Sequence, residues 1–207
     1  MTKKKPDQRA MSARPQPARE RILIATIACV EREGIDAVTT RAIAREAGVN
    51  IAAINYYFQS KDRLVALALE RTLDEAFAEP LAALDHLRAD ARPREALVEL
   101  LDQLVAGAVE YPRIAFAHLR DPITQQGYDA PVLARLGRFL ESLDRGLGRS
   151  LRPRGRVPRR VALAQLWSVV LMTGLLPGLA RETAGVDLRD TRARRTYVRS
   201  LVAAFFD

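Results

Sequence analysis

The chain is 207 residues long and carries 33 lysines and arginines against 25 aspartates and glutamates, which gives a formal net charge of +8. Its two histidines and single cysteine are too few for the usual Cys/His metal sites, and no glycine-rich phosphate loop, G-x-S-x-G or H-E-x-x-H motif occurs. We therefore expect no cofactor and no enzyme, and read carboxylates such as Asp85, Glu95, Glu99 and Asp102 as solvated helix faces rather than as an acid–base pair.

The positive charge is concentrated near the N-terminus. Residues 1–61 contain 11 lysines and arginines against 6 aspartates and glutamates, an excess that suits a domain approaching polyanionic DNA. Residues 1–17 show no apolar periodicity and no apolar run of a secretory signal, so we expect a disordered basic leader. Either this leader touches the DNA backbone or it only aids solubility.

Residues 18–33 have the periodicity of an amphipathic helix. The apolar face of this helix carries Ile22, Ala25, Thr26, Cys29 and Val30. This is the spacing of core residues, and neighbouring glutamates oppose a reactive thiolate. We expect the cysteine to be structural.

Two short helical patterns follow, separated by a tight turn. Thr39 or Thr40 can cap the first helix and Asn50 the second, while Gly48 can take the left-handed conformation that ends a helix. The residues expected to meet in a small core are Ile43, Ala44 and Ala47 on the first helix and Ile54 and Phe58 on the second. This arrangement is typical of a helix-turn-helix, although an Ala-Gly-Val turn also occurs in ordinary helical hairpins.

The outward positions of the second short helix are small or hydrogen-bonding rather than charged. They are Ile51, Ala52, Ala53, Asn55, Tyr56 and Tyr57. Small residues allow close approach to the major groove, and asparagine or tyrosine can reach base edges or phosphates. The face is therefore predicted to contact DNA.

Three segments, RILIATIACVEREG, TTRAIAREAGV and INYYFQSKDRL, make the stretch from about residue 18 to 65 resemble the N-terminal DNA-binding domain of the TetR family of bacterial transcriptional regulators. The resemblance implies that Thr40 and Lys61 hold phosphates and that Arg41 reaches a base. It also implies that five residues of the second short helix face the groove: Ala52, Ala53, Asn55, Tyr56 and Tyr57. Asn50 and Ile51, at the start of that helix, are further DNA-binding candidates. The sequence departs from the commonest family pattern at Ala53, where threonine is frequent, and at Asn55, where tyrosine is frequent.

Asn55 has two readings. It either reads adenine through a bidentate bond, worth roughly 1–3 kcal/mol of discrimination, or contacts the DNA backbone.

The remainder of the chain is predicted to be helical, which gives an all-α fold with a three-helix domain over residues 18–65 and a larger domain over 66–207. Ser60 can cap a helix that runs toward Pro80, and prolines 112, 122 and 131 are read as helix punctuation. Further helices are expected near 81–89, 93–110, 112–120, 130–150, 158–181 and 188–206.

Two segments of the larger domain have alternative interpretations. The loop GRSLRPRGRVPRR is read as solvated rather than as a second nucleic-acid patch, because no aromatic groups accompany its arginines. Residues 161–179 are the most apolar, but polar residues and Pro177 interrupt them, which favours a buried or interfacial helix over a membrane span. We therefore expect a cytoplasmic protein.

The larger domain is expected to bind a small effector and to form a homodimer. Candidate pocket residues are Phe116, His118, Arg120, Tyr128, Trp167 and Met172, although core packing is the default reading of each. Candidate dimer residues are Leu163, Leu166, Val170 and Gly174 on one helix and Tyr197, Leu201 and Phe205 on another. The resemblance implies that these helices pair across a two-fold axis, so that the dimer reads a palindromic operator.

The sequence therefore predicts a repressor that a small-molecule effector releases from its operator by tilting the helix that begins at Ser60. The alternatives are an activator, or an architectural or partner-controlled DNA-binding protein without an effector.

Overall fold

The computed structural model describes residues 17–87, 92–125, 131–147 and 151–207, and these contain helices but no β-strand. The all-α prediction is thus confirmed. The helices are α1 (Ala18–Glu33), α2 (Thr40–Ala47), α3 (Ile51–Phe58), α4 (Lys61–Leu87), α5 (Pro93–Glu110), α6 (Pro112–Gln125), α7 (Pro131–Leu147), α8 (Arg159–Leu175), α9 (Pro177–Ala184) and α10 (Thr191–Phe205). The basic leader up to residue 16 and the pocket candidate Tyr128 lie outside the described residues.

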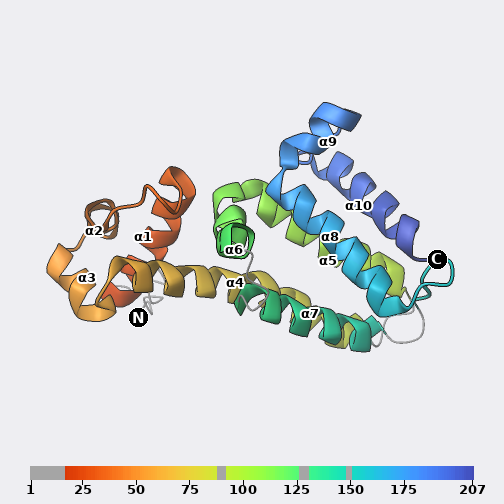
Figure 1. The fold of residues 1–207 in the computed structure, drawn as a ribbon, viewed down its shortest axis with the longest axis horizontal. Helices are drawn as coiled ribbons and strands as arrows, with labels where there is room; N and C mark the ends of the chain where they lie inside the picture. Colours follow the sequence, from red (N-terminus) through yellow and green to blue (C-terminus); the bar gives the residue numbers. More distant parts are fainter. Residues whose placement is uncertain (1–16, 88–91, 126–130, 148–150) are drawn as a thin grey trace, which may run out of the picture.

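The first three helices begin and end where side-chain chemistry predicts. Thr39, rather than Thr40, caps α2 by accepting from the Ala42 amide at 3.1 Å, and Asn50 caps α3 by accepting from the Ala53 amide at 2.8 Å. Gly48 ends α2 with φ of +64°, a left-handed conformation that costs glycine little. Local sequence therefore sets the helix-turn-helix, which occupies one end of the molecule in Figure 1.

The core of this helix-turn-helix unit draws on more than its own helices. The predicted face of α1 is buried, including Cys29, and burial raises the pKa of its thiol, in keeping with a structural cysteine. Ile54 and Phe58 of α3 are each 1% exposed. The same cluster also contains Leu64, Val65 and Ala68 of α4, and Ile114 and Ala117 of α6. Two helices that continue into the larger unit are therefore anchored in the smaller core.

The second core lies among α4, α5, α7, α8 and α10. Ion pairs join α5 to α10 along their length: Asp102 with Arg194, Glu99 with Arg195, and Glu95 with Arg199. Figure 1 shows the long α4 running from the helix-turn-helix unit along the base of the larger unit, beside α7. The two cores are thus joined by α4 below and by α6 in the middle.

Two helices continue through prolines at which the sequence predicted a break. α4 continues through Pro80 to Leu87, so the separate helix predicted over 81–89 is wrong, and α6 continues through Pro122 instead of ending near 120. A proline removes one amide donor and crowds the carbonyl four residues earlier. α6 nevertheless continues past Pro122 to Gln125, so the loss of this one amide donor does not end the helix.

Pro177 does break a helix. The single helix predicted over 158–181 is instead α8 and α9, which meet at an angle of 92°. Pro177 has no amide to donate into the end of α8, and it suits the first turn of α9. Among the described residues no single helix is long and apolar enough to cross a membrane; α8 and α9 pass that test only as a sharply bent pair.

Candidate DNA-binding surface and ligand cavity

The outer face of α3 is exposed as predicted. Tyr56 is 82% exposed, Tyr57 42% and Ile51 41%, and Asn55 and Ala52 are also exposed, while Ala53 is half-buried. The rings of Tyr56 and Tyr57 meet edge to face, with centroids 5.1 Å apart. This face has no covering partner within the described chain, so its side chains are free to enter a groove.

Two residues that were predicted to contact DNA also make hydrogen bonds within the helix-turn-helix unit. The Asn50 side-chain oxygen is used in capping α3, and Lys61 Nζ donates to the Val38 carbonyl at 3.3 Å. Arg41 is exposed and Thr40 half-buried at the start of α2. An asparagine keeps its amide donors and a lysine its remaining protons for phosphate, so both roles are compatible.

Asn55→Ala tests the reading face. Because Asn55 is exposed, we expect unchanged stability and an operator affinity weakened by about 1–3 kcal/mol. Fluorescence anisotropy against operators with single base changes measures it. A loss confined to one A·T pair indicates base reading, a uniform loss indicates a backbone contact, and unchanged affinity contradicts both.

A cavity with two adjoining lobes lies among α4, α5, α6, α7 and α8, and Ile27 of α1 also lines it. The outer lobe is about 560 Å³ and the inner lobe about 130 Å³. Both lobes are lined by Leu73, Leu104, Ala108, Ala115 and His118. The outer lobe adds polar groups of Thr72, Gln103 and Tyr111, and the inner lobe adds Phe77, Trp167 and Val170. The cavity is thus apolar inside and more polar toward the outside.

The cavity includes some of the predicted pocket residues and leaves out others. His118 and Trp167 line it, whereas Phe116 and Met172 are 45% and 48% exposed and line neither lobe. Arg120 points away, because it pairs with Asp36 at 2.6 Å and with Asp121 at 3.0 Å. These candidates were selected by residue type, and helical periodicity sends Phe116 to the opposite side of α6 from Ala115 and His118.

Most of the residues that line the cavity were not predicted from the sequence. Leu104 and Ala108 of α5, with Tyr111 directly after it, recur at the three- and four-residue spacing of one helix face, as do Ala115 and His118 of α6. That periodicity was readable from the sequence. That these two helix faces meet across a cavity depends on tertiary packing, which could not be read from the sequence.

His118 is held in its neutral form. Burial and, to a lesser extent, the charge of Arg135 lower its pKa to about 4. His118 Nε2 lies 3.0 Å from Thr72 Oγ1, and the Thr72 hydroxyl donates its proton to the Leu69 carbonyl at 2.8 Å. Because the Thr72 hydroxyl has only one proton and directs it to the Leu69 carbonyl, we place the imidazole proton on Nε2, which leaves the Nδ1 lone pair as an acceptor.

The neutral imidazole makes stability depend on pH. Because the folded-state pKa of His118 lies below the ordinary 6.5, its contribution is complete above pH 6.5 and is lost as the pH falls toward 4. Between neutral pH and pH 4 we expect the wild type to lose roughly 2–3 kcal/mol more unfolding free energy than His118→Gln. Urea denaturation across this range measures the difference, and parallel losses in the two proteins would contradict it.

The predicted dimer residues need correction. Leu163, Leu166, Val170 and Gly174 are buried within one chain, so they cannot form the contact with a second copy. Gly174 faces α5, because a Cβ there would lie 2.8 Å from the Ala108 Cβ. Tyr197, Leu201 and Phe205 are half-buried against the larger core. The exposed apolar residues of this region are Val161 and Met172 of α8, Leu176, and Leu179 of α9.

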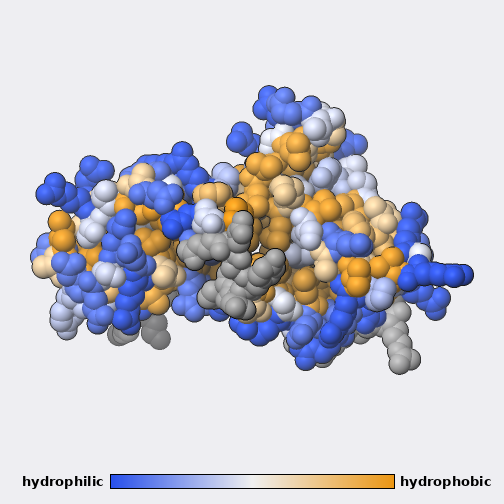
Figure 2. Space-filling model, in the orientation of Figure 1, coloured by the Kyte–Doolittle hydropathy of each residue, from blue (hydrophilic) through white to orange (hydrophobic). Residues whose placement is uncertain are grey.

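Figure 2 shows hydrophobic surface in the middle of the molecule and below α9. A groove of about 330 Å³ runs between α8, α9 and α10, and Met172, Leu176 and Leu179 line it together with half-buried Tyr197. The surface available to a second copy is therefore the outer face of the helices that were predicted to pair.

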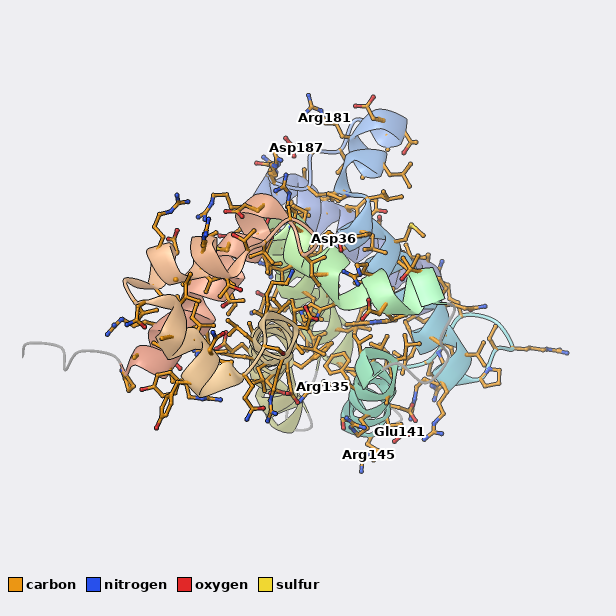
Figure 3. The ribbon with its side chains drawn as sticks, turned by 60° about the vertical axis from the view of Figure 1, so that its left-hand side comes forward. Asp36, Arg135, Glu141, Arg145, Arg181 and Asp187 are labelled. Atoms are coloured by element: carbon orange, nitrogen blue, oxygen red, sulfur yellow. The ribbon has the colours of Figure 1, made fainter. Side chains whose placement is uncertain are left out.

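Helix α6 connects the cavity to the DNA-binding unit. The amide of Ile114 donates to the Glu31 carboxylate at 3.0 Å, Arg113 donates to the Arg32 carbonyl, and Arg120 pairs with Asp36. Figure 3 shows Asp36 beside α6, and Arg135 between α4 and α7, where it pairs with Asp74. One helix thus carries cavity residues on one side and contacts with α1 and the α1–α2 connection on the other.

Comparisons with known proteins agree with this layout. Residues 22–68 match the family model described as bacterial regulatory proteins, tetR family. The transcriptional repressor KstR of Rhodococcus jostii is 26% identical over 82% of this chain and 76% of the relative.

Solved structures share the whole fold. A TetR-family transcriptional regulator from Mesorhizobium loti superposes with a TM-score of 0.64 at 17% identity, over 92% of this chain and 97% of that one. The transcriptional regulator FadR of Bacillus subtilis, solved in complex with stearoyl-CoA, gives a TM-score of 0.62 at 15% identity, over 89% and 98%. These likenesses extend from the helix-turn-helix into the larger unit.

Proposed function

We propose that this chain is a TetR-family transcriptional regulator that represses transcription by holding a palindromic operator until a small molecule enters the cavity. Residues 18–65 would read the operator, and residues 66–207 would bind the effector and form the homodimer. The main support for the proposal is the position of α6. Some of its residues line the cavity, and some pack into the smaller core.

Homodimerisation would place two copies of α3 on one side of the DNA. The exposed apolar residues of α8 and α9, with the groove beside them, support a two-fold contact through this region. A two-fold dimer with recognition helices about 34–36 Å apart reads two half-sites one DNA turn apart.

Release follows from a shift of helices when the cavity fills. A ligand that prefers a displaced α6 would pull on Ile114 and on the contacts of Arg113 and Arg120, and so move α1 with the reading unit. α4, which passes from one core to the other, would tilt with it. The separation of the two α3 helices would then no longer match one DNA turn.

The cavity also favours control by a small molecule over an architectural role, because a purely architectural protein needs no void of this size. A regulator is favoured over an enzyme because the relatives are transcriptional regulators. FadR, which shares the fold, was solved with a small-molecule ligand, and this supports a ligand-binding role for the larger unit.

The test is release of the operator by ligand in wild type and in the double variant Glu31→Ala/Arg120→Ala. Both side chains link α6 to the smaller unit, but neither faces DNA or the cavity, so we expect operator affinity to change by less than about threefold. The weakening of operator binding by saturating effector should shrink by about fivefold or more. Arg195→Ala, on the far helix α10, is the control. Equal release in the double variant and the wild type would contradict the proposed route, and a library in which no small molecule releases the operator would contradict effector control.

A further inference from the structure

Resting on the proposed function, we propose that the effector is an uncharged, mainly apolar molecule bearing a hydroxyl group that accepts a hydrogen bond from the Trp167 indole and donates one to His118 Nδ1. The proposal deepens the site by naming the class of ligand. It depends on three features of the cavity: an unpaired donor, an unpaired acceptor and the charges of the wall.

The unpaired donor is the indole of Trp167. This side chain is 4% exposed, and its Nε1 is buried without an acceptor among the described residues. The ring cannot easily turn to find one, because Phe139 and Phe77 pack against it with centroid distances of 5.1 and 6.3 Å. A buried donor left unpaired costs about 1–3 kcal/mol. Trp167 lines the inner lobe, and its Nε1 is closed to water while the lobe is empty, so we infer that a ligand whose entry parts the wall supplies the acceptor.

The unpaired acceptor is Nδ1 of His118, which lines both lobes. Its ring is neutral, its Nε2 proton is committed to Thr72, and no described residue donates to Nδ1. A neutral imidazole with this tautomer can only accept at Nδ1. A ligand that satisfies both groups brings a proton as well as a lone pair, and a hydroxyl group carries both.

The wall disfavours an anionic ligand. Among the described residues that line the two lobes, none is a lysine or an arginine. The nearest guanidinium that affects His118 belongs to Arg135, and it is already paired with Asp74. Glu75 at the outer lobe would repel an anion, although its own partner is Arg71 at 2.7 Å. A carboxylate or phosphate would lose its hydration without a cation in return.

The size and lining of the lobes suit the remainder of such a ligand. The two lobes together fall in the range of small-molecule sites, which is about 300–1,000 Å³. Leu136, Val170 and Leu171 surround the inner lobe, so an apolar body gains from burial there.

The experiment compares three probes on each of two skeletons: 1-dodecanol, its methyl ether and dodecanoate, and 2-naphthol, its methyl ether and 2-naphthoate. Isothermal titration with the full chain measures their affinities, and anisotropy measures their effect on operator binding. The alcohol should bind about three- to tenfold more tightly than the ether on at least one skeleton, because the ether keeps the bond from Trp167 and loses the bond to His118. The carboxylate should bind most weakly.

Two variants locate the contacts. His118→Gln keeps an amide near Thr72 but moves the side-chain acceptor, its Oε1, away from the position of Nδ1, so the alcohol should fall toward the affinity of the ether. Trp167→Phe removes only the N–H from a retained ring, so alcohol and ether should weaken together. Tyr197→Phe, an aromatic that lines neither lobe, is the matched control and should change nothing.

Each outcome decides the proposal. Tighter alcohol binding in the wild type, lost in His118→Gln, supports it even if Trp167→Phe fails to fold. Equal binding of alcohol and ether, preferred binding of the carboxylate, or no binding of either alcohol would overturn it. Operator binding without ligand is measured on the same samples, so a wrong ligand class with intact operator recognition leaves the proposed function standing, whereas loss of operator recognition refutes that function itself.

Discussion

Phe58→Ala is expected to destabilise the DNA-binding unit by about 3–5 kcal/mol and to abolish operator binding. Phe58 ends α3, is 1% exposed, and has the Arg19 guanidinium 5.5 Å from its ring centroid. Its removal leaves a void between α3, α1 and α4 in a core that is small. Whole domains are stable by only about 5–15 kcal/mol, so this loss would unfold the unit for much of the time.

The chain has one tryptophan, Trp167, and it lies in the larger core. Its fluorescence reports that core, while circular dichroism reports all helices. In Phe58→Ala we expect an early loss of helicity with a smaller shift of the fluorescence midpoint. Tyr57→Ala, which alters the exposed neighbour, should leave both transitions in place. Full stability of Phe58→Ala would contradict the assignment of this core.

Asp102→Ala is expected to cost about 3–5 kcal/mol in the larger unit, because it leaves a buried guanidinium without its partner. The side chains of Asp102 and Arg194 are 9% and 11% exposed, and they meet at 2.9 Å between α5 and α10. Arg194 also donates to the Leu188 carbonyl, so it cannot swing into solvent without losing a second bond.

The same two helices provide the control. Glu99 pairs with Arg195 at 2.6 Å, but these side chains are 48% and 46% exposed. Glu99→Ala should cost less than about 1 kcal/mol. Urea denaturation followed by Trp167 fluorescence compares the two variants. If Asp102→Ala and Glu99→Ala destabilised the protein equally, burial would not determine the strength of the ion pairs between α5 and α10.

The helix-turn-helix was predictable because its determinants are local. Asn50 and Gly48 lie within three residues of the backbone groups they serve, and the alternation of buried and exposed positions in α3 follows from helix geometry. The choice of Thr39 over Thr40 as cap was the detail that needed the structure.

The larger unit was less predictable because its determinants are distant in sequence. α8 is apolar on both sides, with Leu163 and Leu166 toward its own core and Val161 and Met172 toward the surface. Such a helix gives no sign of which side faces a partner. In the same way, Pro122 carries a strong local signal for a helix end, yet α6 continues past it to Gln125.

The most direct test of the account is selection of the DNA that the wild-type chain retains from a pool of random duplexes. We expect the retained DNA to be enriched in an inverted repeat with half-sites centred about 10–10.5 base pairs apart. We expect Phe58→Ala to lose this enrichment. Retention of random sequences without an enriched repeat would contradict it.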